Sequence, residues 1–171
     1  MTSPPGSPHV SASPVAMTAP LQPDQPLVLL LHGGTTDLSG KTGLAMLRYS
    51  RNPIVAVVDP AQAGRSLQEI CGIDHPAPVV ASLQDALPHQ PQVAVIGLAP
   101  SGGVLPEPVR RDVAAALAAG LSVANGLHTR LGEQSDLAAL LQPNRWIWDL
   151  RREPEGLQVA AARAATLPCH R

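Results

Sequence analysis

The chain has almost no aromatic side chains and few charges of either sign. It contains no phenylalanine, one tyrosine and two tryptophans, and its formal net charge is −1. A surface that binds nucleic acid needs clustered Lys and Arg, and single-stranded sites also need aromatic platforms. We therefore expect no nucleic-acid partner and a core built from Ala, Val, Leu and Ile.

Cysteine and long apolar runs are also scarce. Cys71 and Cys169 lie far apart, and neither belongs to a Cys/His pattern with the spacing of a metal site, so we expect reduced thiols and no metal. The longest apolar run, LVLLL, is far too short to cross a bilayer. A secretory signal begins with a basic segment, whereas the first 26 residues contain no Lys or Arg. These absences predict a cytoplasmic protein without membrane contact.

Proline, in contrast, is concentrated at the N-terminus. Residues 1–26 are rich in Pro, Ser and Ala and cannot bury enough apolar surface to offset the entropy of ordering, so we expect a disordered leader. The remaining length suits one ordinary domain, expected over residues 27–165, with residues 166–171 as a short linker stub.

Short apolar runs alternate with helical patterns from Leu27 onward. Continuous apolar runs are typical of strands buried on both faces, and their alternation with helices predicts right-handed crossovers in a parallel sheet. We therefore expect an α/β fold with three layers, a Rossmann-like parallel sheet of about five or six strands with flanking helices. The predicted strands are 27–32, 54–59, 93–99, 121–126 and 146–151, and the predicted helices are 39–50, 62–71, 82–87, 106–120 and 133–141.

Ligands of such sheets bind beyond the carboxyl ends of the strands. Polar and glycine residues at those ends are therefore the candidate ligand-binding residues, although glycines there often serve only to turn the chain. The candidates are Lys41, Thr42, Asp59, Ser101, Gly102, Gly103, Asn125, His128, Arg130, Asp149 and Arg151.

The stretch LHGGTTDLSGKTG approaches a phosphate-binding P-loop without matching it. Five residues separate Gly34 from Gly40, one more than G-x-x-x-x-G-K-[ST] allows. Lys41 and Thr42 could still bind an anion at a helix N-terminus, or Lys41 could simply be solvated while Thr42 helps to start the helix.

The sequence also partly matches two other known motifs, one for dinucleotide binding and one for hydrolysis. Asp59 lies 25 residues beyond Gly34, as a ribose-binding acid would, but the G-x-G-x-x-G fingerprint is absent and we do not expect NAD. APSGG at 99–103 approximates the nucleophile elbow of a hydrolase, with His128 and Asp149 downstream. The following Val-Leu-Pro-Glu-Pro delays the helix, and only His170 follows an acid in the required chain order.

Several motifs together resemble the N-terminal domain of the family catalogued as domain of unknown function 1611 (DUF1611), whose characterised function is D-glutamate N-acetyltransferase. The resemblance covers roughly residues 27–165, and the order and spacing of its motifs make it more specific than any one of them. The motifs are GKTGLAMLRYS at 40–50, VAVVDPAQAGRSLQEICG at 55–72, LAPSGGVLPEPVRRDVAAALAAGLSVANGLHTRLGE at 98–133 and WDLRR at 148–152.

The resemblance implies part of a two-domain bacterial cytoplasmic enzyme that transfers an acetyl group from acetyl-CoA to the amine of D-glutamate. Acetyl-CoA would be a co-substrate, with no covalently bound cofactor. In that family a second domain follows with a P-loop-like G-T-D-x-x-x-G-K motif, which this sequence does not contain. We therefore expect the chain to be inactive alone, and we expect its partner to be that domain, a separate chain or another copy of itself.

Acyl transfer needs a base for the amine and hydrogen-bond donors for the oxyanion. We expect His128 to be the base and the N–H groups of Gly102 and Gly103 to be the donors, with Lys41, Arg130 and Arg151 binding the carboxylates of a small anionic substrate or the phosphates of CoA. Alternatively, His128 caps or packs a loop. The alternative for the chain as a whole is a non-catalytic module that binds a small ligand or a nucleotide, or docks onto a partner.

Overall fold

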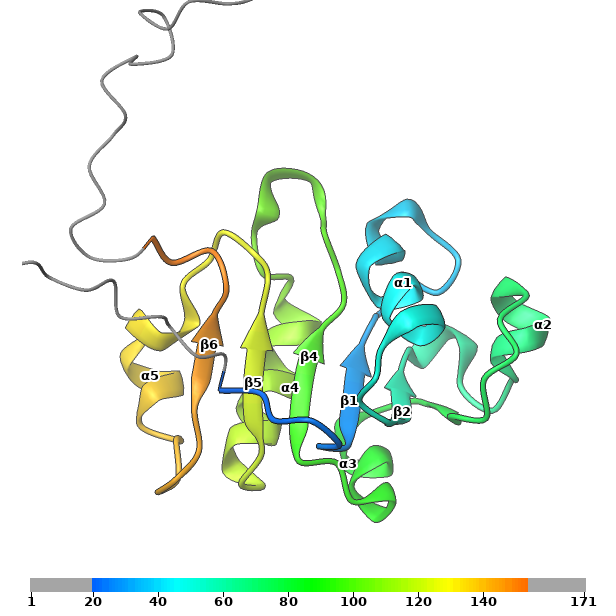
Figure 1. Ribbon diagram of the computed structural model, residues 1–171. Coiled ribbons are helices and arrows are strands. Elements are labelled where there is room, and N and C mark those ends of the chain that lie inside the picture. The colour runs from blue at the N-terminus through cyan, green and yellow to red at the C-terminus, as the bar shows by residue number, and fades with distance from the viewer. Residues whose placement is uncertain (1–19, 154–171) are drawn as a thin grey trace, which may run out of the picture.

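One parallel sheet organises the computed structural model, which describes residues 20–153. Its six strands lie in the order β3-β2-β1-β4-β5-β6, with helices on both sides of the sheet (Figure 1). This arrangement confirms the predicted three-layer, Rossmann-like α/β fold. The strands are β1 Leu27–Leu30, β2 Ile54–Val58, β3 Val79–Val80, β4 Val93–Ile96, β5 Ser122–Asn125 and β6 Ile147–Asp149.

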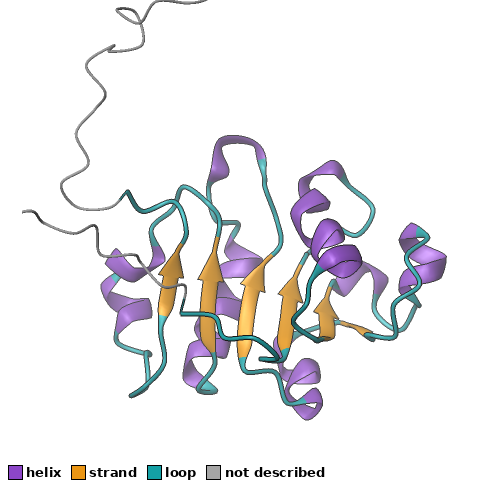
Figure 2. Ribbon diagram, viewed as in Figure 1, coloured by secondary structure: helices purple, strands orange, loops and turns teal. Residues whose placement is uncertain are grey.

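The helices alternate with the strands along the chain, and short 3-10 turns precede or follow several of them (Figure 2). The α-helices are α1 Lys41–Tyr49, α2 Leu67–Cys71, α3 Leu83–Ala86, α4 Glu107–Ala118 and α5 Ser135–Ala138. The 3-10 turns are Leu38–Gly40, Pro60–Gln62, Leu87–His89, Ser101–Gly103 and Leu131–Glu133. Within residues 20–153, none of the helices is long and apolar enough to cross a membrane.

The central strands are apolar on both faces because helices cover both. Every residue of β1 is fully buried, and β1 pairs with β2 on one side and with β4 on the other. Helix α1 lies in front of the sheet in Figure 1, and α4 lies behind it, where it contacts β4, β5, α3 and α5. Continuous apolar runs therefore correspond to the middle of the sheet, as the sequence predicted.

Helix α4 has the clearest local signals and matches its prediction most closely. Pro108 stands in its first turn, and Gly120 follows its end with φ +80°. Its inward stripe consists of Val109, Val113, Ala116 and Leu117, which are all fully buried. The helix predicted at 133–141 is shorter in the structure, because a 3-10 turn takes up residues 131–133 and α5 begins at Ser135.

Two parts of the fold differ from the sequence prediction. Strand β3 was not predicted because it pairs over only two residues, Val79 and Val80. Residues 20–26, assigned to the disordered leader, lie against the fold, because the Asn52 amide donates to the carbonyls of Gln22 (2.8 Å) and Gln25 (3.2 Å). The rest of the predicted leader, the end of the predicted domain at 154–165 and the linker stub at 166–171 lie outside the described residues.

Burial lowers the pKa of His75 below its ordinary value of 6.5, and its Nδ1 accepts the Ala77 backbone N–H at 3.1 Å. The unfolded chain therefore binds a proton here more readily than the folded chain does. We expect the free energy of unfolding to decrease as the pH falls below about 6.5, and His75→Gln to weaken this dependence. Urea denaturation at pH 7.5 and 5.5 measures it. His89→Gln, at an exposed position, is the control, and an equal slope in the two variants would contradict the prediction.

Candidate functional site

A small cavity opens at the carboxyl edge of the sheet, beyond the ends of β4, β5 and β6. It measures about 210 Å³, and it brings together three segments that are far apart in the sequence. It therefore collects several of the predicted site residues in one place. The cavity is lined by Ala99, Pro100, Gly102, Gly103, Gly126, Leu127, His128 and Arg151.

Arg151 and His128 lie side by side in this cavity. The Arg151 Nε donates to the Gly126 carbonyl at 2.6 Å, and its Nη1 lies 3.4 Å from the His128 Nε2. Because a guanidinium group only donates hydrogen bonds, Nε2 faces it as an acceptor, which assigns the proton of a neutral imidazole to Nδ1. The pair places the positive charge of the guanidinium next to the imidazole ring.

The turn at residues 101–103 approaches the imidazole closely at Gly103. Gly102 and Gly103 have φ values of +78° and +64°, and a Cβ on Gly103 would collide with the His128 ring. The His128 N–H donates to the Gly103 carbonyl at 3.1 Å. The Gly103 N–H already donates to the Pro100 carbonyl at 2.9 Å, so of the two predicted oxyanion donors Gly103 is committed to the turn and Gly102 is the better candidate.

Asn125 and Asp149 shape the loop that carries His128. The Asn125 amide is buried; it donates to the Thr129 carbonyl (2.6 Å) and to the Asp149 carboxylate (2.7 Å), and it accepts the Leu127 N–H (3.0 Å). Asp149 also accepts the N–H groups of Leu131 (3.1 Å) and of the next residue, Gly132 (3.0 Å). Both side chains were predicted to bind a ligand, and in the structure their polar atoms hydrogen-bond to the loop.

Asp59 is likewise turned toward its own protein. Its fully buried carboxylate accepts the backbone N–H groups of Gly33 (2.9 Å) and Thr35 (3.3 Å), together with the Thr35 hydroxyl (2.5 Å). In a phosphate-binding turn such N–H groups face the ligand. Here an internal carboxylate takes the place of that anion, so Asp59 does not extend toward a ribose.

The position between the ends of β1 and β4, where dinucleotides bind in Rossmann-like sheets, is filled by the chain itself. The Gly43 N–H donates to the Gly97 carbonyl at 2.9 Å, and the Ala99 N–H donates to the Ser39 carbonyl at 2.6 Å. The turn after β1 and the start of α1 therefore contact the segment that follows β4 directly through the backbone. The cavity beside His128 lies further along the edge, between the segments that follow β4, β5 and β6.

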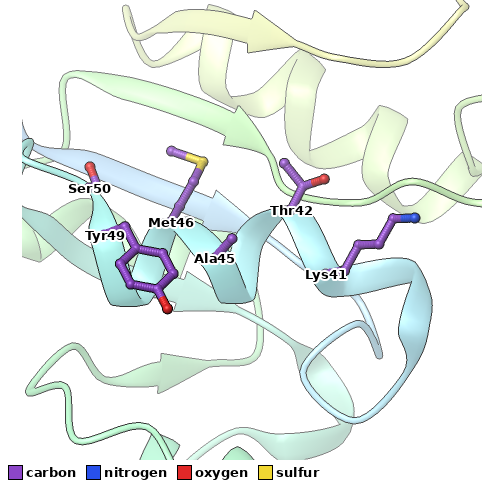
Figure 3. Close-up of a pocket in the computed structure, with 6 residues that line it drawn as sticks. All are labelled: Lys41, Thr42, Ala45, Met46, Tyr49 and Ser50. Carbon is purple, nitrogen blue, oxygen red and sulfur yellow. The ribbon is translucent and has the colours of Figure 1, made fainter.

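Lys41, Thr42 and Arg130 lie outside this cavity. Lys41 and Thr42 are exposed at the start of α1 and line a separate groove along that helix (Figure 3). Arg130 pairs with Glu133 on the surface at 3.0 Å. The predicted basic set is therefore divided, and Arg151 is the member of it that reaches the His128 cavity.

The sequence prediction missed a second histidine pair at the end of β1. The His32 Nε2 lies 2.7 Å from the Asp112 Oδ2, and the two side chains are 12% and 16% exposed. His32 also adopts a left-handed φ of +36°. Asp112 was detectable, because it lies one helical turn from Val109 on the inward stripe of α4, where a carboxylate needs a partner. Among residues 20–153, no cluster of His, Cys, Asp and Glu suited to a metal ion is found.

Comparison with known proteins places this fold and edge in a family. The model of the Rossmann-like domain of unknown function DUF1611_N matches residues 60–153. The chain belongs to the DUF1611 family. The crystal structure of a DUF1611 family protein from Anabaena variabilis ATCC 29413, at 2.30 Å resolution, is 54% identical to this chain and superposes with a TM-score of 0.76. No curated protein matches the chain.

The two DUF1611 chains differ greatly in extent. The match with the Anabaena protein covers 85% of this chain but 42% of the other, so this chain spans less than half the length of its solved relative. The comparison supports family membership and a Rossmann-like domain for this chain.

The first test concerns the close contact between Gly40 and Gly34 in the turn that follows β1. A Cβ on Gly40 would collide with the Gly34 carbonyl, which is backbone and cannot rotate away. We expect Gly40→Ala to lower the free energy of unfolding by about 2 kcal/mol, as overpacking does. Chemical denaturation measures the change. The matched control is Gly126→Ala, where a Cβ meets nothing within 4 Å; equal losses in both variants would show that the contact is not constraining.

The second test concerns the loop of this DUF1611 member that carries His128. Asp149→Ala leaves the Leu131 and Gly132 N–H groups without their acceptor and removes one of the two acceptors of the Asn125 amide. We expect a loss of about 2 kcal/mol in stability and faster amide hydrogen exchange over residues 125–132. Asp136→Ala is the matched control because its ion pair with Arg110 is exposed and contributes little. Unchanged exchange in Asp149→Ala would refute the assignment.

Proposed function

We propose that the cavity at the carboxyl edge binds a small anionic substrate and that Arg151 is its main anchor. The observation that carries this proposal is the juxtaposition of the Arg151 guanidinium with the His128 imidazole over a turn of two glycines. Guanidinium groups bind carboxylates through paired, charge-assisted hydrogen bonds. The cavity volume of about 210 Å³ lies below the roughly 300 Å³ at which pockets for drug-sized ligands begin, which favours an amino-acid-sized acid over a nucleotide.

The more specific proposal is that this chain is the N-terminal half of a D-glutamate N-acetyltransferase-like protein. Membership of the DUF1611 family supports it. The substrate would be D-glutamate, held through a carboxylate by Arg151, and acetyl-CoA would be the acetyl donor. His128 would take a proton from the amine, and the Gly102 N–H would donate to the oxyanion.

The length of the solved relative shapes this proposal. Because this chain spans 42% of that protein, acetyl transfer would require the part that it does not span. A P-loop-like domain, supplied by a longer protein or by a partner chain, would bring the CoA-binding groups to the carboxyl edge. Alone, the chain would bind the acid without turning it over.

A second candidate function is a non-catalytic ligand-binding module. It is favoured by the contact between the His128 Nε2 and the Arg151 Nη1, because a lone pair directed at a guanidinium is not available to an amine. In this case Arg151 still anchors the anion, and His128 helps to orient the guanidinium.

Isothermal titration of D-glutamate into the full chain tests the anchor. We expect binding that Arg151→Ala weakens at least tenfold, because one charge-assisted pair contributes about 1.5–3 kcal/mol. Arg145→Ala, exposed in the segment before β6 and distant from the cavity lining, is the matched control and should bind normally. The absence of heat with D-glutamate, acetyl-CoA and nucleotides would contradict an anion site.

Chromatographic detection of free CoA distinguishes the two candidate functions. The assay mixes this chain with the separately produced part of the longer relative that this chain does not span. Release of CoA that His128→Ala abolishes would support the transferase, whereas binding of the acid without any release in this mixture would support the non-catalytic module.

A further inference from the structure

Strand β6 ends the sheet on one side, and its outer edge presents backbone groups. Among residues 20–153 no strand lies beyond β6, which stands at the left end of the sheet in Figure 1. Even-numbered backbone groups of β6 face β5, because the Val123 N–H donates to the Trp146 carbonyl at 2.9 Å. The N–H and carbonyl of Ile147 and the N–H of Asp149 therefore face away from the sheet. Such an edge can pair with a further strand.

A groove of about 400 Å³ runs beside this edge. Its apolar wall includes Leu141 and Ile147, and its rim carries the carboxylates of Glu133 and Asp149 and the guanidinium of Arg152. An ionised carboxylate offers about four acceptor positions, and Asp149 uses three of them for the 125–132 loop. The groove is therefore suited to apolar side chains, with an acceptor for a cation at one end.

Both tryptophans of the chain lie at this edge. Trp146 and Trp148 share one face of the strand, their ring centroids are 6.4 Å apart with an angle of 82° between the planes, and both remain partly exposed. Leu140 and Leu150 are 37% and 51% exposed on either side of the strand in the sequence. Aromatic side chains are enriched in the centres of interfaces between chains. The composition of this edge is therefore that of an interface.

We propose that the occupant of this edge is a second copy of the same chain. Two copies of β6 pair antiparallel about a twofold axis at Ile147, so that two six-stranded sheets join edge to edge. The carboxyl edges of the two sheets then point in opposite directions. The dimer consequently needs no ligand in the His128 cavity, and this inference is independent of the proposed function.

The edge is complementary to itself in this register. Ile147 exchanges both backbone hydrogen bonds with its counterpart, and the Asp149 N–H donates to the carbonyl of residue 145 in the other copy. The exposed side chain of Arg145 lies opposite Asp149 of the other copy, on the face of the strand that carries Ile147. Trp146 lies opposite Trp148 on the other face, which brings four aromatic rings together across the axis.

Charge selects this register over the neighbouring one. An axis at Trp148 would direct the same backbone groups toward each other, but it would place Arg145 opposite Arg151 of the other copy. Like charges directly opposite one another destabilise a strand pair. The axis at Ile147 replaces this repulsion by two symmetric contacts between a guanidinium and a carboxylate.

Sedimentation equilibrium of the full chain, from about 1 μM to about 1 mM, tests the dimer, because small interfaces associate weakly. We expect the mass to rise from 17.8 kDa toward twice that value. Arg145→Glu should weaken association at least about tenfold, because it places two carboxylates opposite each other in both symmetric contacts. Arg51→Glu, an identical charge change at an exposed position before β2, is the matched control and should dimerise normally.

Disulfide cross-linking tests the register. In a chain with Cys71→Ser and Cys169→Ser, Ile147→Cys should form a covalent dimer under mild oxidation, because the two Cα atoms lie about 5.5 Å apart. Leu150→Cys is the matched control: Leu150 is more exposed, but the two copies of this position lie about 20 Å apart in the proposed register.

A protein that stays monomeric over the whole concentration range would overturn the proposal. So would equal weakening by Arg145→Glu and Arg51→Glu, or cross-linking of Leu150→Cys in place of Ile147→Cys, because the copies would then meet through another surface or register. Arg145 is exposed, so its variant keeps the proposal testable even if Ile147→Cys does not fold.

Discussion

The close approach of α1 to strands β1 and β4 is the contact on which the rest of the structure depends. A side chain at Gly97 would lie 2.8 Å from the Leu31 side chain and 2.9 Å from the Gly43 backbone, so helix and strand meet without room for a methyl group. Gly43 also donates its N–H to the Gly97 carbonyl, which ties the first turn of α1 to the end of β4. This glycine contact fixes where α1 lies, and thereby which part of the carboxyl edge is closed.

The closed part of the edge explains why the sequence resembles a P-loop and a dinucleotide-binding turn without matching either motif. In a dinucleotide-binding sheet, the turn after the first strand leaves its N–H groups open to a pyrophosphate. Here the N–H groups of Gly33 and Thr35 are satisfied by Asp59, whose carboxylate is buried beneath the turn. An anion brought to this turn would have to displace a buried internal charge, which is unfavourable. The polar groups that remain available to a ligand consequently lie further along the carboxyl edge of the sheet, at His128 and Arg151.

The fold was predictable from the sequence, because apolar runs and helix signals are local properties. The run 27–31 and the proline-to-glycine limits of α4 both specify their elements without reference to the rest of the chain. The site was only partly predictable, since strand ends identify which residues share an edge but not the direction of a side chain. Asp149 illustrates this: its place after the last strand was correct, yet three donors of the 125–132 loop turn its carboxylate away from the cavity.

The motifs that carry the family resemblance divide into two physical classes. The first class is required by the fold. Close backbone approach requires Gly40 and Gly43, and hydrogen bonds within the protein engage the side chains of Asp59, Asn125 and Asp149. His128 and Arg151 have no comparable demand from the fold, because they are exposed and contact each other above a cavity. Lys41 and Tyr49 are similarly exposed along α1. Since packing does not account for these four side chains, the His128 cavity and the groove beside α1 are two places where side chains are available for an interaction.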